Sequence, residues 1–430
     1  MSEPAVRNGR KLLIVQVAAL SHEFDCGDLV FRATESVFPA VTCPVQASFR
    51  TATAPAEHGM VSNGRYFRDL RKAMFWEQSA ALVEGERIWR GLRARGGTVA
   101  MLFWQQSLGE DADIVLSPAP IRRHGGGMIM DCYSRPDGLY RHLCDRLGRP
   151  FRLRDYWGPL DKARAGEWIA EATAEVLAGT DPAPDLCLTY LPTLDYDLQR
   201  YNPVGRRAKL AFAALEGQLR GLHDTARGRG YDVLVFGDYA IRKVAAAVFP
   251  NRALAEAGLL KLRPVKGMLY PDLYASRAFA MVDHQVAHVY VPRAEDEPAA
   301  REAVAQLAGV DRIMDRQEQR DKAADHPNSG ELVLESAVGT WFAYPWWTHK
   351  SEAPDYAGHV DIHNKPGYDP CELRFGWPPP SVSQDTARVR GSHGRVGAEN
   401  KVAWAATMDL PGQPASLVEL AGAVKAWLDR

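Results

Sequence analysis

Four separated segments of this 430-residue chain carry side chains that are able to do chemistry, and the first is centred on Thr42. Thr42 stands between strand-like residues and Pro44, where a helix is expected to begin. Backbone N–H groups and the helix dipole favour an anionic group at such a position. A hydroxyl there can attack phosphorus if a metal or a base lowers its pKa. Spacing alone favours a plain helix N-cap at this position, so Thr42 is a candidate nucleophile with a structural alternative.

The other three segments place two carboxylates and an imidazole just after apolar runs or between glycines. Asp195 follows the run Leu186–Leu191, Asp238 follows Val233–Phe236, and His393 lies in a glycine-containing loop. Carboxylates at the end of a strand are typical hard ligands for divalent cations. Aspartates in such turns also cap helices, and a single loop histidine is more often structural. The functional interpretation predicts that Asp195, Asp238 and His393 converge on one site.

The elements that must position these residues follow from the apolar periodicity. Continuous apolar runs predict buried strands of a central, mostly parallel sheet; these runs are Leu12–Leu20, Val99–Trp104, Leu186–Leu191 and Val233–Phe236. Helical patterns lie between them, at Ala80–Arg95, Asp137–Leu147, Glu167–Leu177 and Arg206–Arg227. Strands that alternate with helices indicate a layered α/β fold. Functional groups should then gather at the carboxyl ends of the strands.

The texture of the sequence changes after about residue 261. Three short strand-like pieces lie at 278–282, 287–291 and 332–334. They flank a helical pattern at 299–307. The stretch 340–380 is rich in Trp, Tyr, Pro and Gly and predicts an irregular loop wall over a pocket. An amphipathic pattern at 415–428 predicts a closing helix. We therefore predict a core of residues 1–260 and 381–430, with a smaller α/β subdomain and pocket loops inserted at 261–380.

Composition and charge restrict the partners of the protein. The 52 Lys and Arg against 53 Asp and Glu give a net charge of −1, which argues against a dedicated nucleic-acid binder. The six cysteines lack metal-ligand spacing and are typical of reduced thiols. The run Leu12–Leu20 is too short for a membrane span and lacks the cleavage pattern of a signal peptide. We expect a cytoplasmic protein with no nucleic-acid or membrane partner; its oligomeric state is left open.

The ordered set of motifs resembles the type I phosphodiesterase/nucleotide pyrophosphatase branch of the alkaline phosphatase superfamily. The resemblance extends from about Leu12 to Gly397. It rests on Thr42-Cys43-Pro44, His58-Gly59 with Asn63, Asp195 to Gln199 before Tyr201-Asn202-Pro203, Gly237-Asp238-Tyr239-Ala240 and Gly391-Ser392-His393-Gly394. The resemblance implies a three-layer α/β/α core, Thr42 as the nucleophile, and Asn63 as a donor to a phosphoryl oxygen.

Three residues depart from the pattern of that family. Ala18, Gln199 and Tyr239 stand where the family has an Asp and two His ligands of a two-zinc site. Zinc takes sulfur, nitrogen or carboxylate oxygen ligands, and neither alanine nor a neutral tyrosine can substitute in kind. Other segments of the sequence are similar to those of a bacterial alkaline-phosphatase-like subgroup with altered metal ligands. We therefore expect one divalent ion rather than two.

The sequence segments shared with this subgroup contain residues that could replace the missing metal ligands. His284 and His288 are four residues apart at the end of a predicted strand, and even spacing places them on one face; His288 is expected to pack within the subdomain. The predicted ligands of the single ion are Asp195, Asp238, His284 and His393. Further candidate site residues are Gln199, Tyr239, Asp283 and His363. Zn²⁺ is the expected ion, with Mn²⁺ or Mg²⁺ as alternatives.

These residues lead to one functional hypothesis with two alternatives. The leading hypothesis is a metal-dependent hydrolase that cleaves a phosphate diester, a monoester or a nucleotide-type phosphoanhydride of a small molecule through Thr42. The first alternative is a repurposed fold that acts as a lyase, isomerase or group transferase with reduced or no metal. The second is a non-catalytic binding protein, which gives Thr42, Asn63, both aspartates and His393 no shared reason to be present.

Overall fold

The computed structural model describes residues 9–24, 29–125, 127–160, 163–179 and 183–430. Its central sheet has the strand order β2-β22-β11-β1-β10-β5-β6-β9. The strands are β1 (Lys11–Val17), β2 (Arg32–Thr34), β5 (Val99–Leu102), β6 (Ile114–Pro118), β9 (Cys132–Arg135), β10 (Leu186–Leu191), β11 (Tyr231–Gly237) and β22 (Val402–Ala406). The five strands from β11 to β6 run parallel, whereas β22 and β9 run antiparallel to their neighbours. The central sheet is therefore mixed but mostly parallel.

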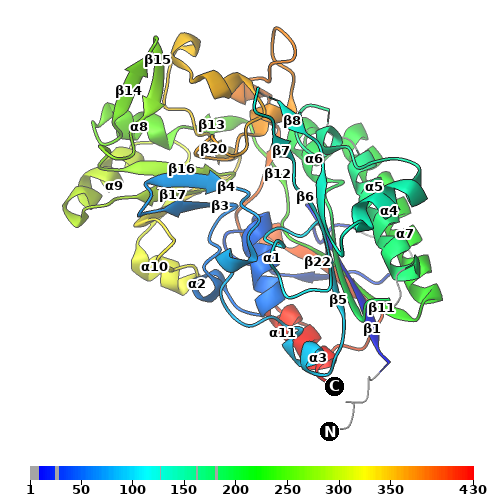
Figure 1. Ribbon diagram of the computed structural model, residues 1–430. Helices are drawn as coiled ribbons and strands as arrows, with labels where there is room; N and C mark the ends of the chain where they lie inside the picture. The colour runs from blue at the N-terminus through cyan, green and yellow to red at the C-terminus, as the bar shows by residue number, and fades with distance from the viewer. Residues whose placement is uncertain (1–8, 25–28, 126, 161–162, 180–182) are drawn as a thin grey trace.

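Helices cover both faces of this sheet (Figure 1). One face carries α4 (Leu139–Leu147), α5 (Arg164–Gly179) and α7 (Arg206–Gly228). The other face carries α1 (Thr42–Thr51) and α11 (Leu417–Leu428), which pack against each other. Strands β5 and β10 are buried at every position, which explains why they read as continuous apolar runs. The expected three-layer α/β/α fold is confirmed.

A second, antiparallel sheet lies beside the first (Figure 1). Its order is β16-β17-β19-β18, and its strands are β16 (Phe279–Asp283), β17 (Val286–Tyr290), β18 (Val310–Met314) and β19 (Leu332–Ser336). The helices of this region are α8 (Pro250–Glu256), α9 (Glu297–Ala305) and α10 (Arg316–Asp321). Short strands add hairpins or pairs: β14 (Leu262–Val265) with β15 (Met268–Pro271), and β13 (Ala246–Val248) with β20 (Thr340–Phe342). This sheet has its own hydrophobic core.

A hairpin from the amino-terminal third of the chain belongs to that second core. Strands β3 (Gly64–Phe67) and β4 (Lys72–Phe75) pair with each other, and the Tyr66 ring contacts the rings of Phe279 and Tyr290, both at 4.7 Å between centroids. The predicted boundaries at residues 260 and 381 remain a prediction. The packing of this hairpin shows that the second core also draws on residues before 260.

The predicted helix Ala80–Arg95 is wrong. The segment forms a 3₁₀ turn at Ala80–Leu82 and a short helix α3 (Arg90–Ala94). Gly85 between them has φ +92°, a backbone conformation that interrupts a right-handed helix. Arg87 binds the carbonyls of Ala80, Val83 and Gly85, so these backbone groups are satisfied outside a helix.

The remaining elements are short. They are α2 (Pro55–His58), α6 (Asp195–Tyr201), β7 (Ile121–Arg122), β8 (Met128–Ile129), β12 (Arg242–Lys243) and β21 (Gly391–Ser392). The stretch 340–380 contains β20 and 3₁₀ turns but no α-helix among its residues, all of which are described. The five described cysteines are free thiols, and Cys26 lies outside the described residues.

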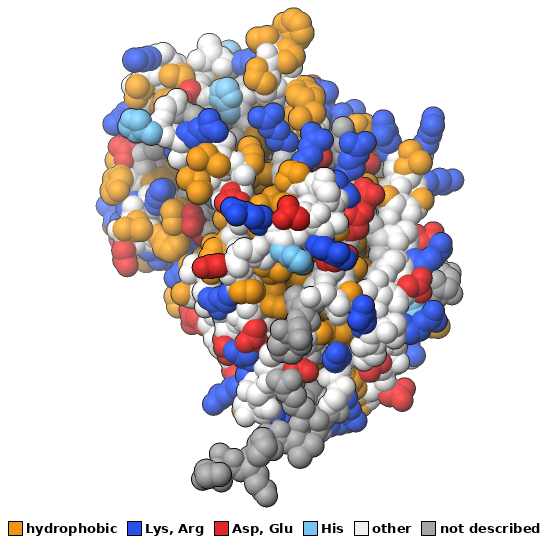
Figure 2. Space-filling view, turned by 45° about the vertical axis from the view of Figure 1, so that its right-hand side comes forward, with side chains coloured by type: hydrophobic (Ala, Val, Ile, Leu, Met, Phe, Trp, Pro, Cys, Tyr) orange, Lys and Arg blue, Asp and Glu red, His pale blue; other side chains and the backbone are white. Residues whose placement is uncertain are grey.

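The surface shows no segregation of charge on the face drawn in Figure 2, where basic, acidic and apolar side chains lie side by side. This mixture agrees with the near-balanced composition of the sequence. Within the described part of the chain, none of the helices combines the length and the apolar character needed to cross a membrane.

Candidate active site

Thr42 is the first residue of α1 and is only 4% exposed. Thr42, Tyr190 and Tyr239 line the same cleft. Pro44 fits the first turn of the helix, where no intrahelical N–H donor is required. The free N–H of Cys43 is bound by Asn63 Oδ1 at 2.9 Å. The start of α1 is therefore fixed by Asn63, and Thr42 is held at that start.

The Thr42 hydroxyl borders a cleft of about 600 Å³, its open mouth included. Of the predicted residues, the cleft is lined by Thr42, Asp195, Tyr239, His284 and His393. These side chains come from segments that are far apart in the sequence. Asn63, Gln199, Asp238 and Asp283 are buried behind the lining. His363 does not line the cleft, and its Nδ1 contacts the carbonyl of Phe75 at 3.1 Å.

The Asp195 carboxylate is bound by neutral donors on both oxygens. Tyr239 donates from its hydroxyl to Oδ1 at 2.9 Å, and Gln199 donates from Nε2 to Oδ2 at 2.8 Å. The Tyr368 hydroxyl in turn donates to Gln199 Oε1 at 3.0 Å. Burial, with the nearby Asp195 charge as a second cause, raises the pKa of Tyr239 well above its usual value. Tyr239 is therefore a neutral hydrogen-bond donor, and burial also raises the pKa of Asp195.

Asp238 is fully buried and is held in the same manner. Gln16 donates from Nε2 to Asp238 Oδ2 at 2.9 Å, and the backbone N–H groups of Ala19 and Tyr239 donate to Oδ1 at 3.0 and 2.9 Å. Burial raises the pKa of Asp238 well above its usual value. The neighbouring Ala18 is 0% exposed and contributes only a methyl group. The amide of Gln16 thus occupies one side of a carboxylate that the family resemblance assigns to a metal.

These donors do not fit a two-zinc centre. A carboxylate binds zinc through an oxygen lone pair, and each oxygen of Asp195 and Asp238 accepts at least one hydrogen bond from a neutral N–H or O–H group. Ala18 has no ligand atom, and Tyr239 is neutral. Among the described residues, no three or more His, Cys, Asp and Glu side chains are grouped so that they could hold a metal ion. The predicted ion at Asp195, Asp238, His284 and His393 therefore lacks structural support.

His393 stacks on Tyr239 with 3.5 Å between ring centroids and 3° between ring planes. Its Nδ1 contacts the carbonyl of Ala40 at 2.8 Å, so Nδ1 carries the hydrogen. Burial, together with nearby His284, lowers the pKa of His393 well below its usual value. His393 is therefore a neutral ring that packs against the site at the end of β21.

Asp283 and His284 lie at the tip of the β16–β17 hairpin and form a close pair. His284 Nδ1 lies 2.7 Å from Asp283 Oδ1. Asp283 Oδ2 accepts from the Ser62 hydroxyl at 2.8 Å and from the Asn63 N–H at 2.7 Å, and Asn63 Nδ2 donates to Oδ1 at 3.1 Å. The second sheet thus delivers a carboxylate–imidazole pair to the edge of the central sheet. The sequence placed both residues in the site but did not indicate this pairing.

Asn63 is buried beside the start of α1. It is 2% exposed and does not line the cleft. Its oxygen binds the Cys43 N–H, and its nitrogen binds Asp283. Asn63 therefore ties the start of α1 to Asp283; its role as a donor to a phosphoryl oxygen remains a prediction.

Sequence reasoning missed several residues of the site. Tyr190 and Gln105 line the cleft, Tyr368 lines it and binds Gln199, and Gln16 binds Asp238. Tyr190 and Gln16 are polar residues inside apolar strand runs, and such residues need a buried partner. That signal was present in the sequence, whereas Tyr368 was hidden in the irregular stretch 340–380.

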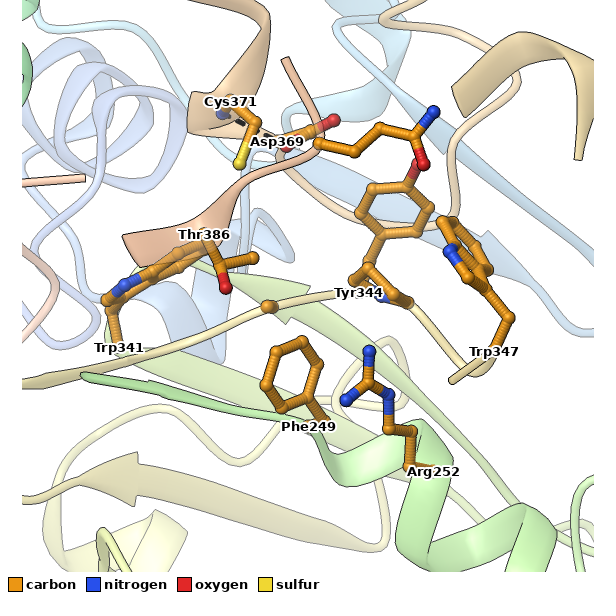
Figure 3. Close-up of a pocket in the computed structure, with 11 residues that line it drawn as sticks. Phe249, Arg252, Trp341, Tyr344, Trp347, Asp369, Cys371 and Thr386 are labelled. Atoms are coloured by element: carbon orange, nitrogen blue, oxygen red, sulfur yellow. Dashed lines mark hydrogen bonds between the residues drawn. The ribbon is translucent and has the colours of Figure 1, made fainter. Parts of the chain in front are cut away.

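A second pocket is lined in part by Asp369 and Cys371 (Figure 3). Its walls include the rings of Phe249, Tyr344 and Trp347, and the Arg252 guanidinium lies 3.8 Å from the centroid of Phe249. Asp369 borders both this pocket and the Thr42 cleft. None of the predicted site residues lines the second pocket.

The position of Thr42 at the start of α1 and the three-layer α/β/α architecture agree with an alkaline-phosphatase-like fold. The sequence profile of the type I phosphodiesterase/nucleotide pyrophosphatase family matches residues 16–369. The chain belongs to that family and is an enzyme of it, with the specific reaction open. No curated protein is detectably similar in sequence.

Solved structures share the fold at low sequence identity. Phosphonoacetate hydrolase from Sinorhizobium meliloti 1021, in complex with phosphonoformate, is 15% identical with a TM-score of 0.63 over 98% of this chain and 96% of that chain. Murine ectonucleotide pyrophosphatase/phosphodiesterase 5 is 12% identical with a TM-score of 0.60 over 98% and 95%. An inactive threonine-to-alanine variant of the murine protein, in complex with AMP, gives the same values.

Proposed function

We propose that the cleft binds a small phosphorylated substrate and cleaves its phosphate ester or phosphoanhydride bond, with Thr42 as the nucleophile. The observation that carries this proposal is the Thr42 hydroxyl at the first residue of α1, on the wall of a cleft. The positive end of the helix dipole favours a phosphoryl group there. The related murine protein, with a threonine-to-alanine variant described as inactive, supports a threonine nucleophile.

The residues around Thr42 suit an anionic substrate. The Tyr190 phenol is kept neutral by burial and lines the cleft together with Thr42. Neutral donors aimed at a phosphoryl group stabilise the negative charge that develops on its oxygens. The Thr42 oxygen forms a bond to phosphorus as the bond to the leaving oxygen breaks, and water then releases phosphate from Thr42. A divalent metal and a cytoplasmic location remain predictions.

A second candidate is a lyase, isomerase or group transferase that works with reduced or no metal. The neutral donors on Asp195 and Asp238 favour this alternative, because they replace the contacts that metal ions make in a two-metal hydrolase. This second candidate would form a product without releasing phosphate or a phosphate ester, which distinguishes it from the first candidate.

The test compares the native protein with Thr42→Ala and Thr42→Ser on bis-p-nitrophenyl phosphate, nucleoside diphosphates and phosphonoacetate. Thr42→Ala should lower kcat by about 1,000-fold or more, because a missing nucleophile leaves only binding and electrostatic stabilisation. Thr42→Ser keeps a hydroxyl and should retain part of the activity. Circular dichroism should show that both variants are folded. Full activity of Thr42→Ala would exclude the proposed nucleophile.

A further inference from the structure

We propose that Asp283 and His284 form a catalytic dyad in which His284 moves the proton of Thr42 and Asp283 positions the imidazole. This inference rests on the proposed function, because it supplies the base that a threonine nucleophile needs. It assigns to the hairpin of the second sheet a role that a metal ion has in the two-metal arrangement.

The hydrogen bonds of the pair define the roles of the two nitrogens. Asp283 can only accept, so the 2.7 Å contact places the hydrogen of the neutral ring on His284 Nδ1. The Nε2 lone pair is then the acceptor, and the ring lines the cleft. Ser62 and Asn63 hold the Asp283 carboxylate with three further donors. A base oriented by a fixed carboxylate is the arrangement that activates hydroxyl nucleophiles in unrelated enzymes.

The His284 ring is also held on both faces. Its centroid lies 3.9 Å from that of Tyr368 and 3.8 Å from that of His393. The backbone at His284 has φ +61°, which is uncommon for a residue other than glycine. Unfavourable backbone conformations of this kind cluster at functional sites, where the surroundings maintain them. The packing and the backbone together direct His284 into the cleft.

Two connections bring the dyad to Thr42. Asn63 binds the N–H of Cys43, next to Thr42, with its oxygen and binds Asp283 with its nitrogen. On the other side, Tyr239 lines the cleft with Thr42 and stacks on His393, and the His393 ring contacts that of His284. Thr42 and His284 line the same cleft. The nucleophile and the base are therefore fixed to one frame although 242 positions separate them.

Other groups in the cleft are less suited to this task. The oxygens of Asp195 already accept hydrogen bonds from Tyr239 and Gln199. His393 Nδ1 contacts a backbone carbonyl rather than a carboxylate, so it lacks the charge that stabilises an imidazolium. Among the described residues that line the cleft, His284 is the histidine with a carboxylate on its second nitrogen.

The proton balance of the reaction follows from this geometry. The Thr42 oxygen forms a bond to phosphorus, its proton passes to His284 Nε2, and the bond from phosphorus to the leaving oxygen breaks. His284 then gives that proton to the leaving oxygen. In the second step His284 takes a proton from water, water oxygen bonds to phosphorus, and the Thr42 oxygen leaves and receives the proton. No oxidant, reductant or second substrate is required.

The first test is the tautomer of His284, which needs no substrate. Long-range ¹H–¹⁵N correlation spectra of protein labelled at histidine should show His284 with hydrogen on Nδ1 and a lone pair on Nε2. His284→Asn identifies the signal, because asparagine tolerates a positive φ. Asp283→Asn should change the chemical shift of the His284 nitrogens. A native His284 with hydrogen on Nε2 alone would contradict the dyad.

The second test is covalent labelling by diisopropyl phosphorofluoridate, read by mass spectrometry at Thr42. The Thr42 oxygen bonds to phosphorus, fluoride leaves, and the proton goes to His284. The labelling rate should fall about 100-fold or more in His284→Gly, and in Asp283→Asn by a similar factor. Added imidazole should restore part of the rate in His284→Gly but none in Thr42→Ala. His142→Ala, an exposed histidine of α4, is the matched control.

The outcomes separate the dyad from the proposed function. Labelling of Thr42 at an unchanged rate in His284→Gly would overturn the dyad and leave the nucleophile intact. Labelling that is lost with a chelator and restored by Zn²⁺ would also overturn the dyad. No adduct at Thr42 in the native protein would overturn the nucleophile and, with it, the base that is assigned to Thr42.

Discussion

At the scale of single residues, the buried histidines behind the site are kept uncharged by their surroundings. His58 Nδ1 accepts from the Met60 N–H at 3.1 Å, and its Nε2 lies 2.8 Å from the Ser48 hydroxyl. Burial lowers the pKa of His58 to about 3, with Arg50 as the next cause, and burial lowers that of His288 to about 4. Both rings therefore pack as neutral groups at neutral pH and connect α1, α2 and the second sheet.

This burial predicts a pH dependence of stability. Below about pH 6.5 the unfolded chain binds a proton at His58, whereas the folded protein does not until the pH is near 3. The unfolded state then binds more protons than the folded state. The contribution of neutral His58 to the free energy of unfolding is therefore complete above pH 6.5 and decreases as the pH falls. The loss amounts to a few kcal/mol between pH 6.5 and 4. Urea unfolding across this range measures it.

The matched variant for this prediction is His58→Gln, which keeps polar atoms but does not titrate. It should be less stable than the native protein at pH 7, and its stability should fall less steeply towards pH 4. An equal slope in both proteins would assign the pH dependence to other groups.

At the scale of elements, the ends of the central strands approach one another closely at the site. Gly237 ends β11 directly before Asp238, and a Cβ on Gly237 would lie 2.0 Å from the Leu20 carbonyl oxygen. That oxygen also accepts from the Ala403 N–H. The missing side chain at Gly237 therefore allows β11 to pass the segment after β1 and to bring Asp238 beside Gln16.

Gly237→Ala should consequently destabilise the protein by about 3 kcal/mol or more, since the clash is with backbone and not with a flexible side chain. Gly221→Ala is the matched control, because a Cβ at Gly221 on α7 would meet no atom within 4 Å apart from its chain neighbours and the backbone of its own helix. Alanine in a helix interior is favoured over glycine, so Gly221→Ala should stabilise the protein by about 0.5–1 kcal/mol. Urea unfolding of both variants measures the difference. Similar stabilities would show that the Leu20 segment moves away.

The predictable part of the fold is the part encoded in local patterns. Strands β1, β10 and β11 were found because parallel strands covered on both faces are continuously apolar. The mixed composition of β9 at the sheet edge gave no such signal. The 80–95 segment has helical spacing but is interrupted at Gly85, whose conformation depends on its surroundings.

The sequence could predict which residues of the candidate site lie near one another. Thr42, Asp195, Tyr239, His284 and His393 line one cleft. Asp195 and Tyr239 do so because polar residues after parallel strands share one edge of the sheet. Their hydrogen-bond partners were not predictable. Whether Asp195 faces a metal or the Tyr239 hydroxyl depends on side-chain directions that only the packed structure fixes.

At the scale of the whole molecule, the site is assembled from both sheets. Thr42, Asp195 and Tyr239 follow elements of the central sheet, whereas Asp283 and His284 come from the second. Positions 18, 199 and 239, which depart from the family pattern, lie in three segments that converge on Asp195 and Asp238. Only the complete fold brings these three positions together.

This convergence predicts that metal binding can be restored by three substitutions made together. Ala18→Asp, Gln199→His and Tyr239→His should give a protein that binds about two Zn²⁺ per chain, as a two-metal site does. The native protein should bind far less at the same free Zn²⁺. Ala18→Asp alone should be destabilised by several kcal/mol, because it buries an unpaired carboxylate. Elemental analysis after dialysis measures the metal, and thermal unfolding measures the stability. Two tightly bound Zn²⁺ in the native protein would contradict the prediction.

The positive φ at His284 has a consequence for how related sequences should be sorted. Only a few residue types accept that backbone conformation readily, chiefly glycine, asparagine, aspartate and histidine. A relative with glycine or asparagine at this position can thus keep the hairpin and the fold while it lacks the imidazole. A single substitution at this position would remove the proposed base and leave the fold unchanged. The identity of this one residue is therefore a practical marker when activity is assigned to uncharacterised relatives.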